Sequence, residues 1–412
     1  MPIKQIINIK VWLRAFLETY AAFLGMLRFC FHWKSGSSAL FILPAERAGN
    51  LGDEAMLVGS IQHLRSQGIQ KIGIVIFELD AHWSNLGLID EVIVLHRGWD
   101  HFKFVHAAYR YASVYCIAAD MMDGFYSDDA TRRLTRLGTL AVKAGAAVSF
   151  LGFSFNEHPT PGSVQAIAQL PTAVNLFARD PISHARLTQL IQRPFSLVGD
   201  CAFLLKPAQD SEIVARVLQW IQDQRQHNRI VCGINVNNLL LYQSKKIDAT
   251  ELIHVYAKAL IEIFERHPNL SIFVIPHDNR GKVSDESLAH DLVNALPQSI
   301  EPYCAVLPFP CAAAEVKAVV AELDFVLTGR MHLAIACLGQ GTPVAGVAYQ
   351  GKFEGLFKHF DLTGMTIEPQ QLLNPGALSQ FMLDLLQQRQ SLREQIQAKL
   401  PEVQTLARAN FN

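Results

Sequence analysis

The sequence predicts an α/β protein made of two Rossmann-like domains, each with a parallel sheet, and a ligand cleft between them. Its 412 residues exceed what one ordinary hydrophobic core holds. From Leu40 onward, short apolar runs alternate with stretches of helical length, which is the pattern of strands connected by helices. A polar patch at residues 206–210 interrupts this alternation, which then begins again. We therefore expect a helical segment at residues 1–37, a first Rossmann-like domain at 38–206 and a second at 207–412.

The apolar runs and the amphipathic stretches define the expected elements of each domain. In the first domain we expect strands at residues 39–43, 71–77, 91–95, 114–119, 147–151 and 174–178, with helices at 54–67, at 129–145 and after residue 183. In the second domain we expect strands at 229–234, 270–275, 305–307, 325–327 and 343–348, with helices at 212–223, 250–267, 284–296, 312–323 and, as a polar tail, 378–409. Parallel strands joined in this way end at one edge of the sheet, where ligands bind in open α/β folds.

The composition excludes several classes of function. Half of the residues are hydrophobic and 18% are charged, as in a well-packed globular chain. The formal net charge is -1 and no long basic block is present, so we expect no nucleic-acid partner. Seven cysteines without a Cys-x-x-Cys pair indicate reduced thiols in a cytoplasmic protein. Because no histidine or cysteine cluster has the spacing of zinc ligands, we predict no metal site and no cofactor.

The N-terminal segment is apolar over residues 6–31 but carries Lys10, Arg14 and Glu18 at four-residue spacing. Its uncharged run is too short to span a bilayer, which takes about 20 apolar residues. Charges inside the apolar stretch also argue against a signal peptide. We predict an amphipathic helix that packs on the body of the protein, and the alternative is a helix that lies on the inner face of a membrane.

The turn at residues 328–332 is a candidate anion site, because an apolar strand there passes directly into a helix. Arg330 and His332 fall in the first turn of that helix, where unpaired backbone N–H groups and the helix dipole favour anions. The alternative is that Arg330 pairs with a nearby carboxylate and that His332 packs in the core.

Further polar side chains follow predicted strands of the first domain, at Asn50, Asp53, Asp123, Ser154 and Arg179. We expect them to gather at one edge of the sheet and to line a ligand crevice. Asn50 and Asp53 suit capping of the next helix equally well, and Asp180 before Pro181 is typical of a helix N-cap.

Taken in order, these motifs resemble the polysaccharide pyruvyl transferase family. The resemblance rests on Gly49-Asn50-Leu51-Gly52-Asp53-Glu54-Ala55, Leu151-Gly152-Phe153-Ser154, Ala178-Arg179-Asp180-Pro181-Ile182-Ser183, Gly199-Asp200-Cys201-Ala202-Phe203-Leu204-Leu205, Gly329-Arg330-Met331-His332-Leu333-Ala334, Gly341-Thr342-Pro343-Val344 and Tyr349-Gln350-Gly351-Lys352. It covers residues 38–360 and implies a glycosyltransferase-B-like pair of domains, with the acceptor on the first domain and the donor on the second. It also implies transfer of pyruvate from phosphoenolpyruvate to a sugar diol as a cyclic ketal.

The resemblance implies roles for individual residues as well. Arg330 and Arg179 match the family's phosphoenolpyruvate-binding arginines, and Met331 and Lys352 are expected to complete that donor site. His332 is the expected general acid, because an imidazole titrates near neutrality. The expected groups on the acceptor side are Asp53 as a base and, as hydroxyl-binding residues, Asn50, Glu54, Asp123 and Ser154. Lys352 equally suits a solvated lysine, and His277 suits either a cleft residue or a loop histidine.

One departure from the family concerns the end of the fourth strand. Many members carry three glycines there, whereas this chain has Ala118-Ala119-Asp120-Met121-Met122-Asp123-Gly124. Side chains thus replace a stretch of backbone that could approach a ligand closely, which leaves the identity of the acceptor open. The expected partners are phosphoenolpyruvate and a glycan or lipid-linked sugar acceptor. The rival functions are a glycosyltransferase of the same architecture that uses a nucleotide-sugar, and a non-catalytic binding protein of the same fold.

Overall fold

The computed structural model describes residues 3–30, 37–44, 48–78, 87–96, 100–237, 248–280, 284–348 and 351–412, with the side chains of the first helix described from Trp12 onward. The chain forms two compact units. Unit 1 comprises residues 1–48, 60–201 and 408–412, and unit 2 comprises residues 49–59 and 202–407. Each unit holds one parallel sheet, so the predicted α/β fold class with two parallel-sheet domains is confirmed.

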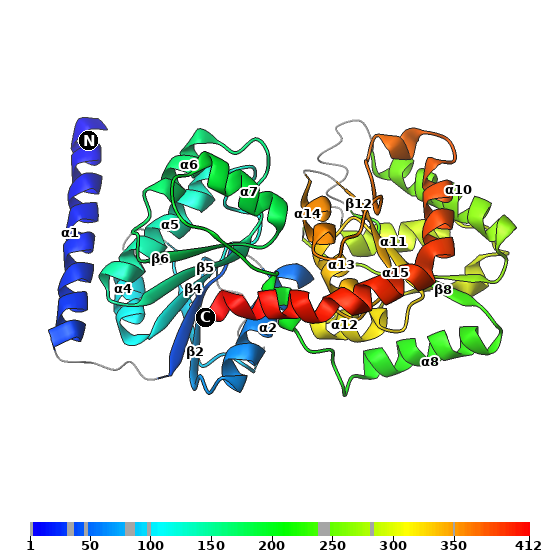
Figure 1. The fold of residues 1–412 in the computed structure, drawn as a ribbon, viewed down its shortest axis with the longest axis horizontal. Coiled ribbons are helices and arrows are strands. Elements are labelled where there is room, and N and C mark those ends of the chain that lie inside the picture. The colour runs from blue at the N-terminus through cyan, green and yellow to red at the C-terminus, as the bar shows by residue number, and fades with distance from the viewer. Residues whose placement is uncertain are drawn as a thin grey trace. The chain divides into compact units, whose positions relative to one another are not determined.

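Unit 1 is built on a seven-stranded sheet with the order β3-β2-β1-β4-β5-β6-β7 (Figure 1). Its strands are β1 (Ser38–Ile42), β2 (Lys71–Ile76), β3 (Glu91–Val94), β4 (Ser113–Ile117), β5 (Ala147–Phe153), β6 (Val174–Ala178) and β7 (Ser196–Leu197). Every pairing is parallel. Because β1 pairs with β2 on one side and with β4 on the other, the strand order reverses between β1 and β4. Such a switch point is where open α/β sheets bind ligands.

The helices of unit 1 are α1 (Ile3–Cys30), part of α2 (Leu51–Ser66), α4 (Asp100–Arg110), α5 (Asp128–Lys143), α6 (Pro161–Ala168) and α7 (Pro181–Leu190), with a final 3-10 turn at Ala409–Phe411. α5 begins after Ser127, whose side chain accepts a hydrogen bond from the N–H of Ala130. Its apolar face, including Leu134 and Leu137, is buried in the same core as Phe150 of β5. All five residues of β1 are buried, as expected for a strand covered on both faces.

α1 packs beside α4 and α5 at the surface of unit 1 (Figure 1). Leu17, Ala21 and Leu24 face inward and are at most 9% exposed. Arg28, one turn further on, donates hydrogen bonds to the carbonyls of Tyr109 and Tyr111 at 3.2 and 2.9 Å. Among the described residues, no helix is long and apolar enough to cross a membrane.

Unit 2 is built on a six-stranded sheet with the order β10-β9-β8-β11-β12-β13 (Figure 1). Its strands are β8 (Ile230–Ile234), β9 (Leu270–Val274), β10 (Cys304–Val306), β11 (Phe325–Thr328), β12 (Val344–Val347) and β13 (Thr366–Ile367). All pairings are again parallel, and the order reverses between β8 and β11. The carboxyl ends of β8 and β11 therefore mark the switch point of this sheet.

The helices of unit 2 connect these strands. They are α8 (Glu212–Gln226), α10 (Ala249–Arg266), α11 (Asp285–Asn294), α12 (Ala313–Val320), α13 (Met331–Leu338), α14 (Lys352–Lys358) and α15 (Ala377–Arg408), with 3-10 turns at Cys201–Leu204, Glu301–Tyr303 and Gln371–Leu373. The first turns of α2 also belong to unit 2, because residues 49–59 group with it. The polar start of α2 thus contacts residues that follow β9 of the second sheet.

Candidate functional site

The turn from β11 to α13 is fastened to the end of the neighbouring strand β8. The hydroxyl of Thr328 accepts a hydrogen bond from the N–H of Arg330 at 2.9 Å and lies 3.1 Å from Oδ1 of Asn235. The carbonyl of Gly329 accepts a hydrogen bond from Nδ2 of Asn237 at 2.6 Å. A Cβ at Gly329 would lie 2.8 Å from Cβ of Asn237, so only glycine lets the two segments approach this closely. The backbone that carries Arg330 and His332 is therefore held in place at the switch point.

Arg330 is buried and bound to two carboxylates. Its Nε and Nη2 donate to Oδ2 and Oδ1 of Asp285 at 3.0 and 2.7 Å, and Nη1 lies 3.2 Å from Oδ2 of Asp278. The side chains of all three residues are at most 6% exposed. Bidentate geometry of this kind fixes a guanidinium firmly. The alternative interpretation of the turn, in which Arg330 pairs with a carboxylate, thus describes the observed contacts.

Asp285 is the anchor of this arrangement. It lies in the first turn of α11, and its carboxylate also accepts hydrogen bonds from Nδ2 of Asn235 at 3.3 Å and from the N–H of His277 at 3.2 Å. Its two oxygens thus receive four hydrogen bonds, two of them from Arg330. Because β8, β9 and α11 supply these groups, the position of Arg330 is determined by three elements of unit 2.

Asn50 caps the start of α2. Its Oδ1 accepts hydrogen bonds from the N–H groups of Gly52 and Asp53 at 2.7 and 3.2 Å. Its Nδ2 donates to Oδ2 of Asp278 at 2.9 Å, and the N–H of Leu51 donates to the carbonyl of His277 at 3.2 Å. Of the two interpretations open for Asn50, helix capping is therefore observed, and the cap is tied to the end of β9.

A second arginine joins Asp53 to the same network. The Nε and Nη2 of Arg280 lie 3.0 Å from the two oxygens of Asp278, and its Nη1 lies 3.5 Å from Oδ2 of Asp53. Burial alone would raise the pKa of Asp278, but the hydrogen bonds from Arg280 and the charge of Arg330 outweigh it and lower that pKa. The pKa of Arg280 is raised in turn, because its bonds to Asp278 and the charge of Asp53 outweigh its own burial.

His332 is partly exposed and lies against Gly52. A Cβ at Gly52 would fall 2.3 Å from Nδ1 of His332 and 2.8 Å from Oδ1 of Asn50. The absence of a side chain in the first turn of α2 thus makes room for the imidazole. The other nearby histidine, His277, is buried, and burial together with the charges of Arg330 and His332 lowers its pKa to about 3. His277 is therefore neutral at physiological pH.

The network contains three carboxylates and two guanidiniums. Asp53, Asp278 and Asp285 are joined to Arg280 and Arg330 by the contacts described above. The cations are thus preorganised by fixed carboxylates, and a neighbouring imidazole can carry a proton. An arrangement of this kind can position a polar ligand and transfer a proton to or from it.

Three further predicted residues lie in unit 2. Glu54 is buried, and its Oε1 accepts a hydrogen bond from the N–H of Ala313 at 2.8 Å, in the first turn of α12. This contact stabilises the start of α12 and gives Glu54 a structural role. Met331 is the first residue of α13 and is partly exposed. Lys352 begins α14 after Gly351, which has a φ of 69°, and is only 8% exposed, so it is not a solvated lysine.

The remaining predicted residues lie in unit 1. Arg179 follows β6 and is buried, with Nε 2.7 Å from Oγ of Ser154 and Nη1 3.0 Å from Oδ2 of Asp200. A Cβ at Gly152 would lie 2.9 Å from Cβ of Arg179, so this glycine lets β5 approach the arginine. Arg179 and Ser154 are therefore brought together, as expected for residues that follow neighbouring strands.

Asp180 and Asp123 have clear structural contacts in unit 1. Asp180 is the N-cap of α7 and accepts hydrogen bonds from the N–H and hydroxyl of Ser183 at 2.7 and 2.6 Å, as predicted. Asp123 is fully buried and accepts hydrogen bonds from the N–H groups of Phe125 and Asn156 at 2.9 and 3.3 Å. Its carboxylate thus fastens the loops that follow β4 and β5, and it is not exposed for direct contact with an acceptor.

Asp285, Arg280 and Asp278 were not predicted as site residues from the sequence. Asp285 follows the N-cap Ser284 in the first turn of a helix, where an acidic residue ordinarily complements the helix dipole. The local sequence therefore does not indicate that Asp285 forms a buried ion pair. Asp278 and Arg280 do follow a predicted strand, at its carboxyl end, and that position was the available signal.

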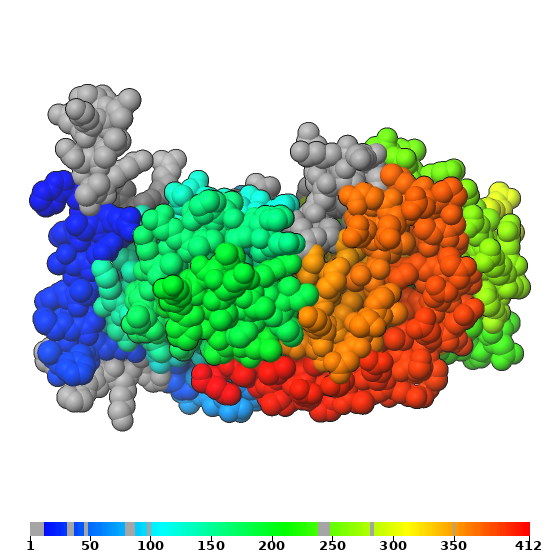
Figure 2. Space-filling view, turned by 45° about the horizontal axis from the view of Figure 1, so that its top comes forward, coloured from blue at the N-terminus to red at the C-terminus, as the bar shows by residue number. Residues whose placement is uncertain are grey.

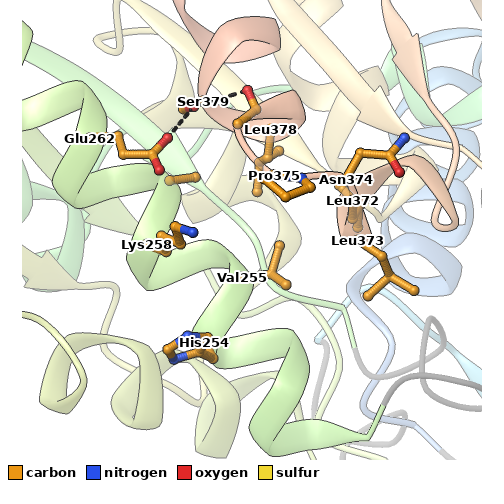
Figure 3. A pocket seen from close by; sticks show the side chains of 12 residues that line it. His254, Val255, Lys258, Glu262, Leu372, Leu373, Asn374, Pro375, Leu378 and Ser379 are labelled. Atoms are coloured by element: carbon orange, nitrogen blue, oxygen red, sulfur yellow. Dashed lines mark hydrogen bonds between the residues drawn. The ribbon is translucent and has the colours of Figure 1, made fainter.

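A pocket of about 180 Å³ lies elsewhere in unit 2, between α10 and the loop that precedes α15 (Figure 3). His254 and Lys258 of α10 line it, and both are exposed. Glu262 at its edge accepts a hydrogen bond from the hydroxyl of Ser379 at 2.6 Å, drawn as a dashed line in Figure 3. None of the predicted site residues lines this pocket, so it has no part in the network around Arg330.

Comparison with known proteins adds two findings. Residues 50–351 match the family model described as polysaccharide pyruvyl transferase. Among solved structures, the chain is similar to a glycosyltransferase from Rickettsia africae ESF-5 (TM-score 0.55, 12% identity, covering 90% of this chain and 96% of that one). It is also similar to UDP-GlcNAc 2-epimerase from Neisseria meningitidis bound to UDP-GlcNAc (TM-score 0.55, 12% identity, covering 90% and 97%). These likenesses show the fold alone. No curated protein sequence matches the chain.

Proposed function

The chain belongs to the polysaccharide pyruvyl transferase family, and we propose that it transfers the pyruvyl group of phosphoenolpyruvate to two hydroxyls of a glycan or lipid-linked sugar as a cyclic ketal. The observation that carries the proposal is the turn that presents Arg330 and His332. This turn lies inside the family-matched region and at the switch point of the second sheet, next to the capped start of α2.

The proposed reaction has definite requirements. The methylene carbon of phosphoenolpyruvate gains one proton, and the adjacent carbon acquires oxocarbenium character. That carbon then forms a C–O bond to each of the two sugar hydroxyls and loses its bond to phosphate. Two hydroxyl protons are released, of which one balances the proton taken up by the methylene carbon and the other leaves with inorganic phosphate. The enzyme therefore needs a general acid, a base and fixed groups that hold an anionic donor.

The site residues described above can be assigned to these requirements. His332 serves as the general acid, and a bound phosphate favours its protonated form. Asp53, beside Arg280, serves as the base for an acceptor hydroxyl. Arg330 supplies fixed positive charge for the donor, and Arg179, Met331 and Lys352 are proposed to complete the donor site as the family resemblance implies.

Charge balance sets a condition on donor binding. The described network around Arg330 has one more carboxylate than guanidiniums, namely three against two. An anionic donor is therefore held more favourably when His332 is protonated and when further cations contribute. Lys352 and Arg179 are the residues proposed to contribute them.

Phosphate release tests the reaction. We expect the protein to release inorganic phosphate from phosphoenolpyruvate only when a suitable glycan is added, and to be stabilised thermally by phosphoenolpyruvate alone. His332→Gln is expected to keep the thermal stabilisation and to lose turnover, because the amide still packs in that place but cannot donate a proton as an acid. His290→Gln, an exposed histidine on α11, is the matched control and should leave both unchanged. Stabilisation by nucleotide-sugars instead of phosphoenolpyruvate would point to a glycosyltransferase, and no response to either would point to a binding protein.

We further propose that the protein works at the cytoplasmic face of a membrane, with α1 lying on the lipid surface. The outward side of α1 carries Trp12, Phe16, Phe23, Met26 and Phe29, which are between 51% and 84% exposed. The spacing of the first four is i, i+4, i+11 and i+14, which places them on one side of the helix. Figure 2 shows α1 in blue at the surface of unit 1.

The charges of α1 favour an anionic lipid surface over a second copy of the helix. Arg14 is 67% exposed at its side chain, and the helix also contains Lys4 and Lys10 by sequence. Glu18 pairs with Arg14 at 3.2 Å and with Lys143 of α5 at 2.6 Å, so its single negative charge is shared between two cations. Two copies packed together would bring like charges near one another, whereas aromatic residues next to basic ones are typical of helices at a lipid surface.

A further inference from the structure

Two aromatic residues stand out in unit 1 because they are adjacent and exposed on the loop that follows β4. Phe125 and Tyr126 follow the end of β4 and are 49% and 40% exposed, and their rings meet edge to face with centroids 5.1 Å apart. Outside α1, the other large hydrophobic residues that are exposed in the described parts of the chain are Leu190 and Leu373. Two adjoining exposed rings form a contiguous apolar patch, which is a candidate contact site on a soluble surface.

The loop that carries them lies at the switch point of the first sheet. β4 pairs with β1 on one side and with β5 on the other, and the strand order reverses between β1 and β4. Ligands of open α/β sheets bind outside the carboxyl ends of the strands at such a point. The aromatic pair thus occupies a position where a ligand is expected on grounds of topology alone.

Buried polar groups hold this loop in one conformation. Asp123 accepts hydrogen bonds from the N–H of Phe125 and from the N–H of Asn156, and the N–H of Thr160 donates to its carbonyl at 2.9 Å. Gly124 has a φ of 77°, and a Cβ there would lie 2.2 Å from Oγ1 of Thr160. The rings are therefore presented on fixed backbone, so that ligand binding does not have to order the loop first.

Polar side chains accompany the rings on the neighbouring loop. Glu157 and His158 follow β5 and are both exposed, and the N–H of His158 donates to Oδ1 of Asn156 at 2.8 Å. Because Asp123 binds the N–H of Asn156 as well as that of Phe125, one carboxylate joins the two loops that carry the aromatic and the polar groups. A patch of two rings is also far smaller than a protein interface, which buries about 800 Å² on each partner.

We propose that Phe125 and Tyr126 form a stacking platform for a hexopyranose ring of the glycan acceptor, with hydroxyls reaching toward Glu157 and His158. A pyranose presents an apolar face of C–H groups and a rim of hydroxyls, which matches an aromatic surface next to exposed polar side chains. This inference rests on the proposed function for the identity of the ligand.

Binding can be tested without the donor, by saturation-transfer NMR with methyl β-D-glucopyranoside, methyl β-D-galactopyranoside and methyl α-D-mannopyranoside. We expect signal transfer to the ring C–H protons of at least one of these sugars, and at least a fivefold loss of it in Phe125→Ala/Tyr126→Ala. Phe125→Trp retains an aromatic face and should retain the transfer. Leu190→Ala, which removes an equally exposed apolar side chain of unit 1, is the matched control and should behave like the wild type.

Steady-state kinetics of the double alanine variant test this inference separately from the proposed function. In the double alanine variant, the acceptor KM measured at saturating phosphoenolpyruvate should rise about tenfold. The KM for phosphoenolpyruvate, measured separately, should change less than twofold. Normal acceptor KM in that variant, or undiminished saturation transfer, would overturn the platform even if pyruvyl transfer is observed. Sugar binding that depends on the two rings in a protein that releases no phosphate from phosphoenolpyruvate would instead leave the platform standing and overturn the proposed reaction. Melting temperatures within about 2 °C of the wild type would show that the variants are folded, as expected for exposed positions.

Discussion

The imidazole of His332 lies against Gly52 so closely that a Cβ at position 52 would fall 2.3 Å from its Nδ1. This contact joins the first turn of α2 to the first turn of α13 and accounts for a glycine where a helix ordinarily disfavours one. The position of the proposed general acid thus depends on a residue that has no functional group of its own.

Gly52→Ala is therefore expected to displace the imidazole. Because His332 is partly exposed, the ring can move aside, and we expect folding to persist while kcat for phosphate release falls about 100-fold. The control is Gly68→Ala at the other end of α2, where φ is +83° and nothing lies within 4 Å of the added Cβ. It should cost about 1 kcal/mol of stability through backbone strain and leave kcat unchanged. A wild-type kcat in Gly52→Ala would show that the contact does not position His332 for catalysis.

Removal of the carboxylate that anchors Arg330 should destabilise unit 2. Asp285→Ala deletes the acceptor of four hydrogen bonds and leaves a buried guanidinium with Asp278 as its remaining partner in the network described. We expect the free energy of unfolding in urea to fall by about 3–5 kcal/mol. Glu322→Ala breaks the exposed ion pair with Arg225, whose side chains are 43% and 45% exposed, and should cost less than about 1 kcal/mol. Equal losses in the two variants would contradict the anchoring role of Asp285.

The fold class could be predicted because apolar runs and helical stretches alternate along the whole chain. β6 begins and ends where its apolar run does, at Val174–Ala178, and Asp180-Pro181 marks the start of α7 as a local cap. α4 and α6 were not predicted. α6 is only eight residues long, and α4 mixes polar and aromatic residues that fit a loop as well as a helix when read without their packing partners.

The candidate site could be predicted only in part, because its contacts are tertiary. The turn with Arg330 and His332 follows from local sequence, as a strand that passes into a helix. That Asp285 binds Arg330 across 45 positions, or that Glu54 holds the first turn of α12, depends on which segments meet after folding. The grouping of residues 49–59 with the second unit also depends on tertiary contacts, because the residues before and after them in the sequence belong to the first unit.

The buried His277 should make stability depend on pH in the mildly acidic range. Its folded pKa of about 3 lies well below the ordinary value of 6.5, so the unfolded chain takes up a proton at a pH where the folded chain does not. The contribution is fully present above pH 6.5 and is lost as pH falls from 6.5 towards 3. The wild-type free energy of unfolding, measured in urea, should therefore decrease between pH 7 and pH 4, by at most about 1.4 kcal/mol per pH unit for this one group.

The variant His277→Gln isolates that contribution. Between pH 6.5 and 4 it should reduce the slope of the free energy of unfolding against pH by the equivalent of about one proton. This reduction is expected whatever the effect of the substitution on stability at pH 7. His254→Gln, at an exposed position of α10, should leave the slope as it is in the wild type. An unchanged slope in His277→Gln would mean that His277 takes up its proton in the folded protein as readily as in the unfolded one.

The outward aromatic side of α1 should bind anionic lipid. We expect the protein to sediment with vesicles of 30% phosphatidylglycerol in phosphatidylcholine and to be released as salt rises, because basic residues on the helix contribute through electrostatic attraction. Trp12→Ser/Phe16→Ser/Phe23→Ser, which changes exposed positions only, should reduce vesicle binding at least tenfold without lowering the melting temperature by more than about 2 °C. Leu190→Ser/Leu373→Ser removes exposed apolar side chains outside α1 and serves as the control. Binding that survives in the α1 variant would show that another surface of the protein holds it on the vesicle. A dimer in solution that this variant dissociates, with no binding of the wild type to vesicles, would show that a second copy covers the helix.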